Sequence, residues 1–91
     1  MSEFPKLLPP GNIQVSRQLV RTSIELGAFA RQQRQHLGFT QDEVAGLGNT
    51  GARFVSELER GKPTSQLQMA LDLLDLIGLE VVVQVKSGGR A

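Results

Sequence analysis

The sequence predicts a mainly α-helical domain with one β-strand near its C-terminus, on three observations. Apolar residues recur at helical spacing in four segments, each bounded by capping or stop residues. A short Gly-Asn-Thr-Gly break at residues 48–51 separates two of these segments. Residues 79–85 place an apolar side chain at every second position, which is typical of a strand. The 91 residues are enough for one domain.

The first predicted helix begins at Ser23, because the preceding Thr22 and the following Glu25 belong to a Thr-Ser-Ile-Glu capping box. Gly38 ends it. Its inward stripe is expected to comprise Leu26, Phe29, Ala30 and Leu37. Upstream, residues 1–21 are rich in proline at their start and read either as an extended, strand-like segment or as a flexible arm.

A second capping box, Thr-Gln-Asp-Glu, starts a short helix at Gln41. Val44 and Leu47 are expected on its inner face, and Ala45 is small enough for a close helix crossing. The Gly-Asn-Thr-Gly break then forms a tight turn, because Gly and Asn accept a left-handed backbone at little cost.

A third helix is expected over residues 51–60, with Val55 and Leu58 buried and Gly61 as its stop. Gly51 begins this helix and is a weaker cap than Ser or Thr. Two short helices joined by a tight turn form a helix-turn-helix. In this motif the second helix presents its N-terminal side chains to base edges in the DNA major groove.

The fourth predicted helix spans residues 65–77, with Thr64 as its cap, and carries two apolar stripes. The first stripe is expected to face the domain and comprises Leu67, Ala70, Leu71, Leu74 and Ile77. The second stripe flanks the first, is available to a second copy of the chain, and comprises Met69, Leu73 and Leu76.

After Gly78, the predicted strand places Leu79, Val81, Val83 and Val85 on one parity. A lone strand leaves both edges unpaired, so the simplest solution is the same strand of a second copy across a two-fold axis. The chain thus divides into an N-terminal extension, a helix-turn-helix domain, a dimerisation strand and a loose tail, at residues 1–21, 22–77, 78–86 and 87–91.

Residues 22–77 resemble the Xre/Cro-type repressor family in Thr40-Gln41, in Ala45, in the turn, and in the run Val-Ser-Glu-Leu-Glu-Arg-Gly at 55–61. The resemblance implies a lambda-repressor-like bundle of four to five helices. It also implies a structural ion pair between Arg34 and Glu59. The chain departs from the family pattern in the turn, where Asn stands for Gly and Thr for an aliphatic residue.

More narrowly, Thr-Ser-Ile-Glu-Leu-Gly, the run at 53–64 and the short tail look like HipB-type antitoxins. That resemblance implies a homodimer whose C-terminal strands pair, a palindromic operator, and a HipA-like kinase toxin encoded alongside. The outer surface that carries the acidic residues Asp72, Asp75 and Glu80, and the N-terminal extension, are candidate toxin contacts. The alternatives are a stand-alone Xre-type regulator of phage or host genes, and a protein-interaction module without DNA binding.

Several residues are expected to contact DNA. Arg53 suits bidentate bonding to guanine, and Ala52 allows close approach to a thymine methyl group. Gln41 can donate its amide to a phosphate. Arg60 and Lys62 resemble the family's phosphate contacts after the recognition helix.

Two neighbours on that helix have alternative interpretations. Glu57 can accept from cytosine N4 or pair with Arg53 four residues earlier, and the pair is favoured. Phe54 is either a wedge at the groove wall or a packing residue, and packing is favoured.

Composition limits the other classes of function. The net charge of +1 does not by itself indicate nucleic-acid binding. The chain has no cysteine, one histidine and no long apolar run or signal-peptide pattern. We therefore expect no metal, no cofactor, no enzymatic activity and no membrane span, and the lack of cysteine fits a reducing cytoplasm. The family resemblance implies a bacterial protein that is associated with the nucleoid.

Overall fold

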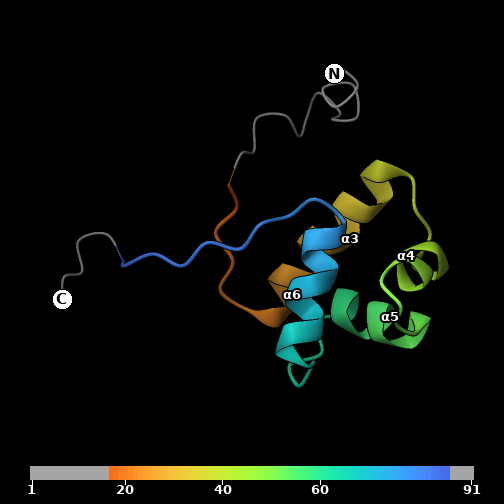
Figure 1. Cartoon of the computed structure of the whole chain (residues 1–91). Helices are drawn as coiled ribbons and strands as arrows, with labels where there is room; N and C mark the ends of the chain where they lie inside the picture. The colour runs from red at the N-terminus through yellow and green to blue at the C-terminus, as the bar shows by residue number, and fades with distance from the viewer. Residues whose placement is uncertain (1–16, 87–91) are drawn as a thin grey trace, which may run out of the picture.

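A computed structural model describes residues 17–86 of the chain. These residues form four helices and no β-strand, joined by short connections around one core (Figure 1). The four helices are α3 (Ser23–Leu37), α4 (Gln41–Leu47), α5 (Ala52–Arg60) and α6 (Leu67–Leu76). The mainly α prediction is confirmed, and the predicted structure of residues 1–16 and 87–91 lies outside the described residues.

Helix α3 begins and ends where its local signals predict. The Thr22 side chain accepts a hydrogen bond from the Glu25 N–H at 3.0 Å, and Gly38 ends the helix in a left-handed conformation. The capping box is only half formed, however. The Glu25 carboxylate accepts from the Arg21 N–H, at 2.6 Å, instead of from the N–H of the cap residue. This contact fixes the chain just before the helix.

Helices α4 and α5 form the predicted helix-turn-helix. The capping box at Thr40 and Glu43 is complete, with both reciprocal hydrogen bonds present. In the turn, Asn49 has a φ of 56°, the left-handed conformation that Asn tolerates better than most residues. Gly51 caps α5 without a side-chain hydrogen bond, as expected for a weak cap.

The C-terminal end of α5 packs directly on α3, and two glycines permit this approach. A Cβ on Gly27 would overlap the Leu58 carbonyl oxygen and lie 2.6 Å from the Glu59 carbonyl oxygen. Gly61, with a φ of 88°, stops α5 against the backbone of Ile24. The Ser23 hydroxyl donates to the Gly61 carbonyl at 2.7 Å and closes the contact.

The core lies where the four helices meet. Its buried apolar residues are Ala30, Val44, Ala45, Val55, Leu58, Ala70, Leu73, Leu74 and Ile77. Leu26, Leu37 and Phe54 are half-buried against it. The predicted inward positions of α5 are therefore confirmed, as are Leu26, Ala30 and Leu37 of α3. Phe29, also expected inside, does not belong to the core; it is half-buried and lines an open depression along α3.

Three predicted positions in α4 and α6 are wrong. Leu47, expected inside, is 60% exposed at the last position of α4. Leu67 is 72% exposed at the first position of α6. Leu73, assigned to the partner-facing stripe, is buried in the chain's own core. Of that stripe, Met69 is half-buried and Leu76 is 40% exposed.

Helix α6 also begins later than predicted, because Thr64 is not its cap. The cap residue is Gln66, whose side chain makes no capping hydrogen bond, and the Ser65 hydroxyl donates back to the Lys62 carbonyl. At the other end the prediction is confirmed. The Gly78 and Leu79 N–H groups donate to the carbonyls of Asp75 and Leu74, which is the Schellman pattern.

Leu79 packs against the core, and residues 80–86 then lead away from the helical body without strand pairing (Figure 1). Val83 is 92% exposed and Val85 is 86% exposed. A strand is defined by its hydrogen-bonded neighbour, which one chain does not supply here. The predicted dimerisation strand therefore stays a prediction.

Candidate nucleic-acid interface

The outward face of α5 carries the polar residues of the recognition helix. Arg53, Ser56, Glu57 and Arg60 recur at helical spacing, opposite the buried Val55 and Leu58. Ser56 was not predicted in this role, although it lies three residues after Arg53. Its hydroxyl accepts from Arg60 Nη1 at 2.8 Å.

Two predicted recognition residues lie closer to the core than the others. Ala52, expected on the outward face, is half-buried and packs against the core. Phe54 is also half-buried against the core, so the packing interpretation of this ring is confirmed. The exposed polar side chains of α5 are therefore the groups available to base edges.

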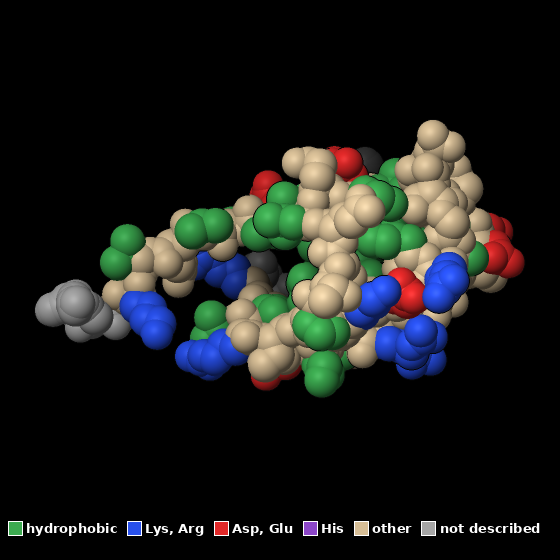
Figure 2. Space-filling view, turned by 90° about the horizontal axis from the view of Figure 1, so that it is seen from below, with side chains coloured by type: hydrophobic (Ala, Val, Ile, Leu, Met, Phe, Trp, Pro, Cys, Tyr) green, Lys and Arg blue, Asp and Glu red, His purple; other side chains and the backbone are tan. Residues whose placement is uncertain are grey.

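Glu57 lies between two cations at the centre of this face. Arg53 Nε and Lys62 Nζ each approach the Glu57 carboxylate to 3.1 Å. Hydrogen bonds from Lys62 and from Arg53 hold the pKa of Glu57 below its ordinary value. The favoured Arg53–Glu57 pair is confirmed, and Lys62 joins it from beyond the helix end. Seen from below, Lys and Arg side chains group around an acidic side chain on this part of the surface (Figure 2).

A buried ion pair fixes α5 to α3. The guanidinium of Arg34 donates to both carboxylate oxygens of Glu59, at 2.6 and 3.0 Å, and to the Phe39 carbonyl at 2.7 Å. The two side chains are only 9% and 4% exposed. The structural pair implied by the family resemblance is therefore present, with bidentate geometry.

The ionisation of this pair follows from its surroundings. Burial alone would raise the pKa of Glu59. The hydrogen bonds from Arg34 and Gln41, with the charges of Arg34 and Arg31, outweigh burial and lower that pKa. The hydrogen bond to Glu59 raises the pKa of Arg34 in turn, against the opposing effect of burial. Both groups are therefore charged at neutral pH.

Gln41 joins this network at the surface. Its Nε2 donates to Glu59 Oε1 at 2.9 Å, a contact between residues 18 apart that no local pattern predicts. An amide nitrogen carries two hydrogens, so the second remains for another acceptor. The predicted phosphate contact is thus held in place by the buried pair beside the recognition helix.

The predicted dimerisation residues of α6 lie away from the outward face of α5. Met69 and Leu76 line a small groove of about 250 Å³ between α6 and the turn at residues 48–50. Within residues 17–86, His, Cys, Asp and Glu form no group of three or more that could hold a metal ion. In the same range no helix is long and apolar enough to cross a membrane.

A family model described as a helix-turn-helix domain matches residues 25–84. The chain belongs to the helix-turn-helix family. A relative of this helix-turn-helix protein is the uncharacterized HTH-type transcriptional regulator y4mF of Sinorhizobium fredii (strain NBRC 101917 / NGR234). The two are 37% identical over 62 residues, which are 68% of this chain and 82% of the relative.

Solved structures share the fold of this helix-turn-helix protein. A HipB–O4 20mer complex has a TM-score of 0.71 and 20% identity, covering 78% of this chain and 100% of that one. A structure described as MDT Protein has a TM-score of 0.72 and 20% identity, with the same coverage. The predicted helix-turn-helix family is confirmed, and the fold is HipB-like. The chain is a DNA-binding regulator of transcription and not an enzyme.

Proposed function

We propose that this helix-turn-helix protein is a sequence-specific repressor that binds a palindromic operator as a homodimer. The observation that carries the proposal is Arg53, whose side chain is 88% exposed on the outward face of α5. An exposed ion pair contributes little to stability, so Arg53 can leave Glu57 for a guanine with small loss. Arg60 and Lys62 flank it as phosphate contacts.

The backbone around Arg53 is held firmly enough for reading bases. The buried Arg34–Glu59 pair and the Gly27 contact fix α5 on α3. Gln41 is fixed to the same carboxylate and offers its second amide hydrogen to a phosphate. Rigid support of this kind sets the register of a recognition helix on the duplex.

A dimer is supported by the apolar surface that one chain leaves exposed. Val81, Val83 and Val85 are more than half exposed, and a second strand across a two-fold axis would cover them. With that register centred on Val83, Glu80 faces Lys86 of the other chain. A single near-neutral chain offers few phosphate contacts, and two chains double them.

The antitoxin role is supported by the likeness to HipB-type proteins. We propose that a HipA-like kinase is the partner, held inactive by this chain and acting as its corepressor in the bacterial cytoplasm at the nucleoid. A kinase gene beside the gene for this chain, and co-purification of the two products, is the expected result. A neighbourhood without any kinase gene would favour the stand-alone regulator instead.

Footprinting of the purified chain on the DNA upstream of its own gene tests the repressor proposal. The expected result is two symmetric protected half-sites about one helical turn apart, or a multiple of that distance. Protection that is uniform along the fragment, or absent at every concentration, would contradict sequence-specific repression.

A further inference from the structure

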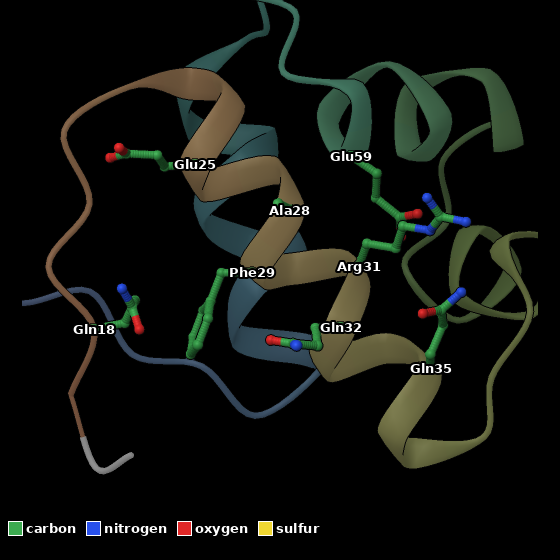
Figure 3. A pocket seen from close by; sticks show the side chains of 8 residues that line it. All are labelled: Gln18, Glu25, Ala28, Phe29, Arg31, Gln32, Gln35 and Glu59. Atoms are coloured by element: carbon green, nitrogen blue, oxygen red, sulfur yellow. The ribbon is translucent and has the colours of Figure 1, made fainter. Parts of the chain in front are cut away.

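The outer surface of α3 carries polar side chains that the helix-turn-helix does not use. An open depression runs along this helix, and its lining residues lie on two sides (Figure 3). Arg31 and Gln35 lie on the side that faces Glu59 and the helix-turn-helix. Phe29 and Gln32 lie on the opposite side, toward the segment before α3.

The position of Arg31 follows from the packing of α3 on α5. Gly27 marks the point where the two helices touch, at the carbonyls of Leu58 and Glu59. Arg31 lies one turn further along the same face of α3, because residues four apart in a helix are neighbours. The charge of Arg31 therefore acts on Glu59 from the surface, while Arg34 holds the same carboxylate from inside.

The cation at Arg31 is not neutralised by its surroundings. The ion pairs among residues 17–86 are Arg34–Glu59, Arg53–Glu57 and Lys62–Glu57. Glu59 is already matched by Arg34 and by the amide of Gln41. Arg31 and Gln35 thus present a full positive charge and an amide donor, both on exposed side chains.

Gln41 donates to Glu59 from α4, and the Arg31 side chain extends toward Glu59 from α3 (Figure 3). We propose that Arg31 and Gln35 bind a phosphate of the DNA backbone adjacent to the one held by Gln41. This rests on the proposed function, and it extends the interface from the helix-turn-helix onto α3. A guanidinium fork matches phosphate oxygens bidentately, and the amide adds a second donor.

A contact of this kind positions the protein and reads no sequence. Its loss should weaken binding to every duplex by the same factor and make the salt dependence less steep. A residue that acts only through Glu59 would instead loosen the free protein and leave the salt dependence unchanged.

The test titrates full-length wild-type and Arg31→Gln protein with an operator duplex and a scrambled duplex of equal length, over a series of salt concentrations. The expected result is a slope of log affinity against log salt that is less steep by about 0.9 per bound chain, on both duplexes. Gln35→Ala should weaken binding to both duplexes equally. Gln32→Ala, the same change on the opposite side of α3, should leave both affinities as they are.

A charge-moved control separates position from net charge. The double variant Arg31→Gln/Gln32→Arg keeps the formal charge but places it on the other side of α3, so the slope should stay reduced. An unchanged slope in Arg31→Gln, or a wild-type slope in the double variant, overturns the inference. If wild-type protein fails to prefer the operator, the repressor proposal fails, while the slopes on the scrambled duplex still decide the role of Arg31.

Discussion

Arg34 and Glu59, 25 residues apart, form a buried bidentate ion pair with N–O distances of 2.6 and 3.0 Å, and the pair joins the first helix to the recognition helix. Gln41 donates to the same carboxylate at 2.9 Å. One buried charge therefore sets the position of α5 and of the side chain predicted to hold a phosphate. The stability of the fold and the geometry of DNA binding depend on the same group.

Replacing Glu59 with Gln should be strongly destabilising, because Arg34 would remain buried without its counter-charge. Loss of one partner of a buried ion pair costs about 3–5 kcal/mol, a large share of the stability of a domain of this size. Urea unfolding followed by circular dichroism measures the effect. Glu57→Gln removes a carboxylate that also pairs with two cations, but at the surface, and should leave the midpoint unchanged. Equal effects of the two variants would contradict the special role of Glu59.

The stability of the protein should also depend on pH through the Glu59 carboxylate. The pKa of Glu59 is lower in the folded protein than its ordinary value of 4.5. The ionised pair therefore contributes fully above pH 4.5, and that contribution is lost as the pH falls through the folded-state pKa. The free-energy gap between wild type and Glu59→Gln should narrow as acid is added below pH 4.5. A gap that stays constant down to pH 2 would show that Glu59 does not titrate with unfolding.

Substitution by alanine should lower the stability of the protein at Gly27 in α3 and raise it at Gly46 in α4. Gly27→Ala places a Cβ against the backbone of Leu58 and Glu59, so α3 and α5 must separate, at a cost of about 1–3 kcal/mol. Gly46→Ala meets nothing within 4 Å and lies inside α4. It should stabilise the protein by up to about 1 kcal/mol through helix propensity. Thermal unfolding of the two variants distinguishes the predictions.

Removal of the chain after Glu80 should shift the proposed dimer to monomer in sedimentation. The cut retains Leu79, which packs against the core, so the helical domain should keep its fold. A shorter cut after Lys86 keeps the proposed strand and serves as the matched control. If the truncation after Glu80 remains fully dimeric at micromolar concentration, the strand is not what joins the chains.

Elements with local signals could be predicted from the sequence, and non-local contacts could not. Thr40 and Glu43 are three residues apart, and a glycine stop acts on the turn that it follows, so both are visible in a short window. The burial of Leu73 and the exposure of Leu47 depend on how the helices pack on one another, which helical periodicity alone does not fix. The start of α6 was misplaced because Thr64 resembles a cap but lies in the loop.

The contacts of the candidate site likewise divide into those that the sequence predicts and those that it does not. The family resemblance implied the Arg34–Glu59 pair, and four-residue spacing favoured the Arg53–Glu57 pair. The contact of Gln41 with Glu59 bridges 18 residues, and Lys62 reaches Glu57 from beyond the helix end. Both depend on how the chain turns after Gly38 and Gly61, so neither follows from spacing.

The most direct test of the account is base-by-base operator binding by Arg53→Ala. Because the exposed Arg53 is proposed to read a guanine, the variant should lose about 1–3 kcal/mol of binding free energy on the operator and relax its preference at one position in each half-site. Gln32→Ala, an exposed position on the opposite side of α3, is the control and should keep that preference. An Arg53→Ala protein that binds every single-base variant of the operator as the wild type does would contradict the assignment of α5 as the reading helix.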